Sequence, residues 1–202
     1  MTIVDLEMTA SESYREFGFA VVPGFISRDL ADFLSTYMNL LGQLDRFFHD
    51  EQVPGTLITY GDPAFETVLA RSAQKVGGIV GAHVLPTYSF ARVYYEGTVL
   101  GRHADRPACE HSVTVHLASS DDSVRYPIGI TGLDGMDRMV DLEPGDGLVY
   151  WGTQLQHWRE PCPTEWFTQF FLHFVDADGP FRSEAFDKRD YLGLPPSPEA
   201  KR

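Results

Sequence analysis

The sequence predicts an α+β protein in which mainly helical N-terminal residues support an antiparallel β-sandwich or barrel. Apolar residues recur at helical spacing in the first 85 residues, and capping residues stand where the periodic segments begin. From about residue 86 the pattern changes to short β-rich runs separated by turn residues. Helices in α+β folds commonly cover one face of a sheet, which leaves one end of the sandwich free to form a pocket.

The first predicted helix is short and leads directly into a strand. Ser11 is its expected N-cap, and the helix extends through Phe17. Gly18 breaks the helix, and the apolar run 19–22 that follows is typical of a buried strand.

Two longer helices are predicted next. Ser27 caps the first of them, in which apolar residues at helical spacing form one face. The second begins at Asp62, because this capping residue is followed by proline at the first helical position. We expect it to end near Gly77, Gly78 and Gly81.

Six β-rich runs make up the remainder of the predicted core, and many short strands at regular spacing are typical of a sandwich or barrel. The runs are 89–95, 112–117, 126–130, 139–142, 147–151 and 166–175. We therefore expect one domain over 1–202, divided into mainly helical support (1–85), a β core (86–176) and a tail (177–202). The tail is rich in Gly, Pro and charge, and we expect it to wrap the surface or fray.

Composition restricts the partners of the chain. The 202 residues include 16 Lys and Arg against 29 Asp and Glu, a formal net charge of -13. Nucleic acids and anionic membranes attract basic surfaces, so neither is expected as the main partner. No apolar run is long enough for a transmembrane helix, and the N-terminus does not resemble a secretory signal. We interpret Cys109 and Cys162 as free, inert thiols in a reducing cytoplasm.

The candidate site consists of His103, Asp105 and His157. Residues i and i+2 of a strand share a face, so an imidazole and a carboxylate at this spacing can meet one metal ion. A histidine from a later strand would complete the two-histidine, one-carboxylate arrangement of non-haem Fe(II) oxygenases. A His-x-Asp tripeptide arises by chance in about half of sequences like this one, so surface histidines are the competing interpretation.

Further residues around this tripeptide resemble a known family. Tyr94 and Gly97 lie nine and six residues before His103, as in the prolyl-4-hydroxylase-like branch of the 2-oxoglutarate/Fe(II)-dependent dioxygenases. Residues 143–150 resemble the turn and strand that lead to the second histidine of that branch. Residues 17–25 resemble the N-terminal strand of related phytanoyl-type oxygenases.

The resemblance implies a double-stranded β-helix, which is a jelly-roll or cupin-like fold, with N-terminal helices buttressing it. It implies Fe(II), 2-oxoglutarate and O2 (dioxygen), with His103, Asp105 and His157 as metal ligands and Tyr94 beside 2-oxoglutarate. The implied reaction is hydroxylation of a C–H bond in a small molecule or amino-acid residue, with release of succinate and CO2. The sequence carries no signal for the oligomeric state.

The sequence departs from the family at the residue that anchors 2-oxoglutarate. The family places Arg or Lys about ten residues after the second histidine, and Phe167 stands at that position here. A buried carboxylate needs a cation or several donors. Arg159 is our first candidate for that cation, with Gln169 as an additional donor. Arg92 and Arg106 are the other candidates.

Other assignments and functions stay open at this point. Arg106 is a candidate for contacting an anion on the substrate, and pairing with an acidic neighbour such as Glu110 is the alternative. We interpret His116 and His173 as core histidines with satisfied hydrogen bonds. A cupin-like metalloenzyme using the same ligands without 2-oxoglutarate is one alternative function. A non-catalytic binding protein on the same scaffold is another.

Overall fold

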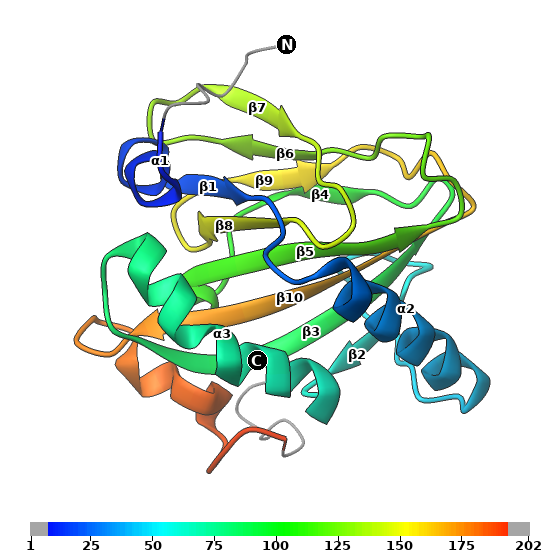
Figure 1. Ribbon diagram of the computed structural model, residues 1–202, viewed down its shortest axis with the longest axis horizontal. Helices are drawn as coiled ribbons and strands as arrows, with labels where there is room; N and C mark the ends of the chain where they lie inside the picture. Colours follow the sequence, from blue (N-terminus) through cyan, green and yellow to red (C-terminus); the bar gives the residue numbers. More distant parts are fainter. Residues whose placement is uncertain (1–7, 194–202) are drawn as a thin grey trace.

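The computed structural model describes residues 8–193, which form an α+β arrangement with two antiparallel sheets (Figure 1). The helices are α1 (Ala10–Phe17), α2 (Arg28–Gln43) and α3 (Pro63–Val80), with short 3-10 segments η1 (Pro107–Cys109) and η2 (Arg182–Lys188). None of the helices in this range combines the length and the apolar character that crossing a membrane requires.

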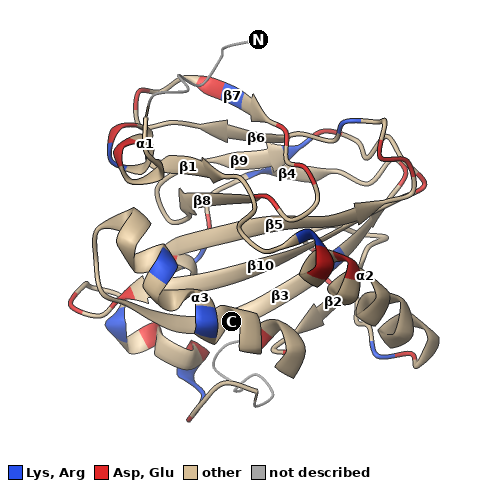
Figure 2. Cartoon of the chain, in the orientation of Figure 1, with Lys and Arg blue, Asp and Glu red and all other residues tan. Residues whose placement is uncertain are grey.

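The larger sheet has six strands in the order β1-β8-β5-β10-β3-β2. Their bounds are β1 (Phe19–Val22), β2 (Leu57–Tyr60), β3 (Val84–Tyr95), β5 (His111–Ser119), β8 (Gly147–Trp151) and β10 (Trp166–Asp176). The two longest strands, β3 and β10, pair with each other in its centre. Figure 2 shows that β5 and β10 are almost free of charged residues, so the acidic surplus lies mainly on loops, helices and edges.

The smaller sheet has four strands in the order β4-β9-β6-β7. Their bounds are β4 (Leu100–His103), β6 (Ile128–Thr131), β7 (Asp137–Val140) and β9 (His157–Arg159). From β3 onward the chain passes repeatedly between the two sheets, with only β6 and β7 as a consecutive pair in one sheet. This alternation brings the ends of β4 and β9 close to the inner face of the larger sheet.

The helices α2 and α3 pack against the larger sheet and bury its outer face (Figure 1). Leu34 of α2 and Phe65 and Leu69 of α3 are almost completely buried and belong to one apolar cluster with Val113 and Phe170 of the sheet. Burial of each such side chain contributes about 1.5–3 kcal/mol to folding. This layer fixes the sheet from outside and leaves its inner face for the site.

The helix starts follow the predicted caps with one correction. Ser27 and Asp62 cap α2 and α3 as expected. Thr9, and not Ser11, caps α1, because Thr9 and Glu12 form a reciprocal capping box. Helix α3 continues through the glycines at 77 and 78 and ends only at Gly81, which adopts a left-handed conformation with φ of 79°.

Three short strands and the tail differ from the sequence-based prediction. We did not predict β2, β4 or β9, because three or four residues are too few to show an alternating pattern. The tail does not lie loosely on the surface over its described part. Asp187 has no exposed area, and the Arg189 guanidinium donates to Glu66 of α3 at 2.6 Å. Residues 194–202 lie outside the described part of the chain.

Candidate functional site

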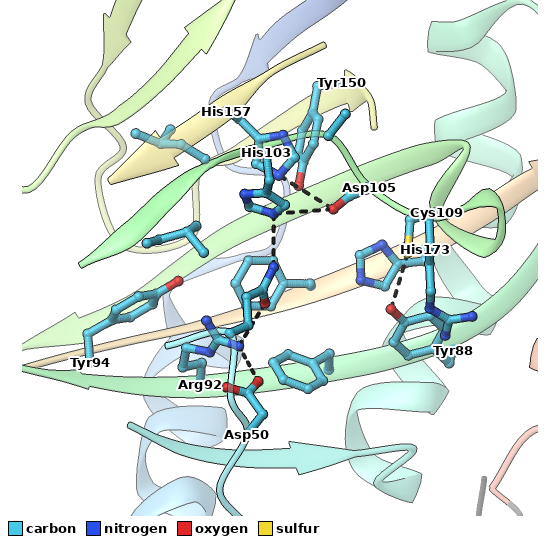
Figure 3. Close-up of a pocket in the computed structure, with 17 residues that line it drawn as sticks. Asp50, Tyr88, Arg92, Tyr94, His103, Asp105, Cys109, Tyr150, His157 and His173 are labelled. Carbon is cyan, nitrogen blue, oxygen red and sulfur yellow. Dashed lines mark hydrogen bonds and ion pairs between the residues drawn. The ribbon is translucent and has the colours of Figure 1, made fainter. Parts of the chain in front are cut away.

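A cavity of about 260 Å³ opens between the inner face of the larger sheet and the ends of β4 and β9 (Figure 3). Even-numbered side chains of β3 face it, because alternate residues of a strand share a face. The lining residues that carry the chemistry are Tyr88, Arg92, Tyr94, His103, Asp105, Arg106, Cys109, His157 and His173. Aromatic side chains of β3 and β10, among them Phe90 and Phe171, form its apolar wall.

The structure brings His103, Asp105 and His157 together, with one ligand atom of each within 4.8 Å of the others. Asp105 Oδ1 lies 3.7 Å from His103 Nε2 and 3.5 Å from His157 Nε2. His103 ends β4 and pairs with His157, which begins β9. Asp105 lies in the loop beyond β4, so the expected placement of both residues on one strand is wrong. A backbone hydrogen bond from Asp105 to Gly152, at 2.8 Å, holds this loop instead.

Backbone carbonyls orient both imidazoles toward a metal ion. His103 Nδ1 lies 2.8 Å from the Gly101 carbonyl, and His157 Nδ1 lies 3.1 Å from the Leu155 carbonyl. A carbonyl only accepts, so each Nδ1 carries the proton and each Nε2 keeps the lone pair that a metal needs. Nε2 of His103 also contacts the Gln52 amide at 3.0 Å.

The protonation of these groups favours metal binding. Burial lowers the pKa of His103, and the neighbouring His157 lowers it further. Burial raises the pKa of Asp105, but hydrogen bonding to His157 and its charge outweigh that effect and hold this pKa below its ordinary value. Both groups are therefore in their ligating forms at neutral pH. Two neutral imidazoles and one carboxylate could hold a divalent metal ion such as Fe(II).

Arg159 and Gln169 lie together beyond the wall of the cavity, and neither side chain lines it. The Arg159 guanidinium is fully buried, donating to Gln169 Oε1 at 2.6 Å and to the Tyr126 carbonyl. Gln169 in turn contacts the hydroxyl of Tyr94, which does line the cavity, at 3.4 Å. Burial lowers the pKa of Arg159.

No carboxylate in the described part of the chain pairs with Arg159, and its Nε has no hydrogen-bond partner there. A buried guanidinium without a counter-anion is costly. Thr114 Oγ1, which points to the same side of β5 as Ser112, is also buried without a partner. These orphaned donors fit a carboxylate group.

Arg92 and Arg106 line the cavity, but each already has a carboxylate partner. Arg92 forms an ion pair with Asp50. Arg106 donates through both terminal nitrogens to Asp187, at 2.7 and 2.8 Å, and lies over the Tyr88 ring. The partner of Arg106 is thus in the tail and is not the neighbouring Glu110.

Sequence reasoning missed several residues of this cavity. His116 is a buried histidine whose Nδ1 lies 2.9 Å from a backbone carbonyl, as expected. His173 is also buried, yet it lines the cavity beside Cys109 and Tyr88. The period-two pattern of β3 could have identified Tyr88, but nothing local to Asp187 in the sequence points to this site.

The comparisons with known proteins yield matches among solved structures only. No protein-family model matches the chain, and no curated protein sequence does. A prolyl-4-hydroxylase of Pseudomonas putida superposes with a TM-score of 0.70 at 17% identity, covering 83% of this chain and 97% of the other. The epimerase SnoN from nogalamycin biosynthesis, solved with Fe3+, α-ketoglutarate and nogalamycin RO, gives 0.72 at 13% identity, covering 93% and 91%.

A third match has a metal and the keto acid bound. HygX from Streptomyces hygroscopicus, solved with nickel and 2-oxoglutarate, superposes with a TM-score of 0.62 at 14% identity, covering 82% of this chain and 85% of the other. These low identities establish a likeness of fold. The chain therefore has the fold of the 2-oxoglutarate/Fe(II)-dependent oxygenase superfamily.

Proposed function

We propose that this protein is an Fe(II)- and 2-oxoglutarate-dependent dioxygenase built on a double-stranded β-helix. The single observation that carries the proposal is the cluster of His103, Asp105 and His157 at the cavity, with both imidazoles oriented by backbone carbonyls. The alternation of β3 to β10 between two antiparallel sheets supports the fold assignment. We further propose that residues 86–176 form the core of one domain.

The three clustered side chains would hold the metal. Two histidines and one carboxylate occupy only part of the coordination shell of Fe(II), which leaves positions for the keto acid and dioxygen. The metal, when bound, supplies the activation of O2 for C–H oxidation. The Gly101 and Leu155 carbonyls keep the histidine Nε2 atoms directed at the ion.

We propose Arg159 as the residue that binds the distal carboxylate of 2-oxoglutarate. Residues 157 and 159 share one face of β9, with their Cα atoms roughly 7 Å apart, so a dicarboxylate held at the metal can extend toward Arg159. The Tyr94 hydroxyl stands between the cavity and the Gln169–Arg159 pair, and it would donate a hydrogen bond to the same carboxylate. Arg159 is preferred to Arg92 and Arg106, because both of those already neutralise an aspartate.

The substrate we propose is a small molecule or an amino-acid residue that is hydroxylated at a C–H bond. A cavity of about 260 Å³ suits a small ligand, and its aromatic wall suits an apolar one. Arg106, held by Asp187 and partly exposed, would contact a polar group of the substrate. Solved enzymes of this fold include a prolyl-4-hydroxylase, an epimerase and a carbocyclase.

The test is an aerobic assay for succinate formed from 2-oxoglutarate with Fe(II), together with anaerobic calorimetry of Fe(II) binding. We expect turnover and metal affinity to fall at least about 100-fold in His103→Ala and Asp105→Ala, because a ligand is removed. His83→Ala, a change in the loop before β3, is the matched control and should leave both quantities unchanged. Full turnover and Fe(II) affinity in Asp105→Ala would refute the ligand assignment.

One observation favours a second candidate, a metalloenzyme that uses the same ligands without 2-oxoglutarate. Both arginines that line the cavity already pair with aspartates, so neither offers a free cation there. Oxidation of a substrate without added keto acid, together with no binding of 2-oxoglutarate to the metal-loaded protein, would support this candidate and overturn the first.

A further inference from the structure

A second group of potential metal ligands lies beside the first and shares one residue with it. Ligand atoms of Asp105, Cys109 and His173 all lie within 4.8 Å of one another. Cys109 ends η1 and His173 belongs to β10, so two elements of the fold position them. Both side chains line the cavity, at the end opposite to Tyr94 (Figure 3). The function proposed above uses neither of them.

The carboxylate of Asp105 is oriented to serve both groups. Its Oδ1 atom is the one near His103 and His157, at 3.7 and 3.5 Å. Its Oδ2 atom accepts a hydrogen bond from the Ser112 hydroxyl at 2.9 Å, on the side of His173. One carboxylate can therefore give one oxygen to each metal ion.

Ser112 also determines which nitrogen of His173 is free. The hydroxyl lies 2.9 Å from His173 Nδ1 and the same distance from Asp105 Oδ2. The carboxylate only accepts, so the single hydroxyl proton goes to Asp105 and His173 Nδ1 must donate. Nε2 of His173 then keeps its lone pair, which is the state of a metal-ligating histidine.

The chemistry of the group selects a soft divalent ion. The sulfur of Cys109 lies 3.1 Å from the Tyr88 hydroxyl, which adds a fourth donor atom. A thiolate and a carboxylate balance the charge of a divalent cation, while Asp187 neutralises the nearby Arg106. Thiolate, imidazole and carboxylate together favour Zn2+ or Cd2+, whereas magnesium and calcium prefer oxygen ligands alone.

Close backbone packing holds this group in place. Gly152 lies where an added Cβ atom would meet the Cys109 carbonyl at 2.3 Å and Asp105 Oδ2 at 2.6 Å. The Ala108 carbonyl accepts a hydrogen bond from the Thr87 hydroxyl at 2.7 Å, which fixes η1 against β3. The ligands are therefore positioned by the fold itself, as a specific site requires.

We propose that Asp105, Cys109 and His173 form a second metal site that binds Zn2+ and Cd2+ and shares Asp105 with the first. The site does not depend on the reaction proposed above. Since both ions use Asp105, binding of the soft ion weakens binding of Fe(II) at the first group, and the coupling is reciprocal.

The test is a titration of the reduced full-length protein with Cd2+, followed by the ultraviolet charge-transfer absorption of a cadmium–thiolate bond. We expect one thiolate per chain to bind, with loss of the absorption in Cys109→Ser. Cys162→Ser is the matched control, because Cys162 is equally buried but lies near Thr164 and away from the cavity. It should retain the full absorption.

Two further variants separate this site from the first and guard against misfolding. His173→Gln should weaken Cd2+ binding at least about tenfold, because a ligand is lost. His103→Ala should keep the thiolate absorption while losing Fe(II) affinity, so the two sites fail independently. An absorption that survives Cys109→Ser, that disappears in Cys162→Ser, or that never appears in the wild-type protein would overturn the proposal.

Discussion

Asp187 accepts two hydrogen bonds from Arg106, at 2.7 and 2.8 Å, although the two residues are separated by 81 positions in the chain. Asp187 lies in the middle of three consecutive non-glycine residues with φ between 53° and 58°. Left-handed backbone of this kind costs about 1–2 kcal/mol per residue. The buried ion pair, together with the hydrogen bond from the Tyr60 hydroxyl, offsets that cost and attaches the tail to the cavity.

Replacement of this carboxylate should therefore destabilise the protein. We expect Asp187→Asn to lower the free energy of unfolding by about 2–3 kcal/mol, because Arg106 loses its counter-charge in a largely buried place. Urea unfolding measures the difference. The exposed Asp178→Asn is the control and should change it by less than about 0.5 kcal/mol. Equal stability of the two variants would contradict the role of Asp187.

Arg159 should control the affinity for 2-oxoglutarate and not that for the metal. In Arg159→Met we expect the dissociation constant of 2-oxoglutarate to rise roughly 10- to 100-fold, since one charge-assisted hydrogen bond is lost. Calorimetry on the metal-loaded protein gives both affinities. Arg125→Met, at an exposed arginine paired with Glu143, serves as the control. An unchanged value in Arg159→Met with a weakened one in Arg92→Met would transfer the role to Arg92.

The buried pair between Glu66 and Arg189 attaches the tail to α3. Both side chains are almost completely buried, and Arg189 also donates to the Thr87 carbonyl at 2.9 Å. Glu66→Gln should cost about 3–5 kcal/mol of unfolding free energy, because it leaves a buried charge without compensation. Glu184→Gln, in the more exposed pair with Lys188, should cost less than about 1 kcal/mol. Similar losses in both variants would exclude a special contribution from the buried pair.

His116 should make the protein less stable in acid. Burial lowers the pKa of its imidazole, and the charge of Arg159 lowers it further. The unfolded chain then takes up a proton below about pH 6.5 that the folded chain does not, so stability falls as the pH falls through that value. In His116→Gln the slope of unfolding free energy against pH should decrease by up to about 1.4 kcal/mol per pH unit. Urea unfolding between pH 7 and pH 5 checks this, with His83→Gln as the control; an unchanged slope would contradict the assignment.

Gly129 of β6 should not tolerate a side chain. A Cβ atom there would lie 2.2 Å from the Trp158 ring, which is itself covered by the Arg102 guanidinium at 3.5 Å. Gly129→Ala should therefore destabilise the protein by about 1–3 kcal/mol through overpacking. Gly101→Ala, in β4 of the same sheet, has open space around its Cβ position and provides the control. The difference in melting temperature between the two variants measures the effect, and equal melting temperatures would show that Trp158 moves aside.

The parts of the site that the sequence predicts are those with local signals. The His-x-Asp tripeptide, the spacing to Tyr94 and the turn before β8 are all features of contiguous residues, and the structure brings the corresponding side chains to one cavity. The helix caps at Ser27 and Asp62 are equally local and are confirmed. Such features need no knowledge of tertiary structure.

The parts that escaped prediction depend on residues far apart in the chain. The pairing of Arg106 with Asp187 depends on how the tail returns to η1, and no pattern near either residue indicates it. Arg159 was predicted to face the co-substrate, and its contacts with Tyr126 and Gln169 depend on how β9 and β10 are packed. The shared use of Ser112 by Asp105 and His173 likewise arises only when three elements meet.

The position of β10 in the larger sheet determines the order in which the chain can fold. Among the described strands, β10 alone joins the pair β2–β3 to the group β1–β8–β5. Its residues come after every other strand in the sequence, so a ribosome releases them last. A nascent chain that ends before Trp166 has two sheet fragments with unpaired edges, which are prone to association. Stable tertiary structure must therefore await nearly complete synthesis, and folding dominated by such distant pairings is slow.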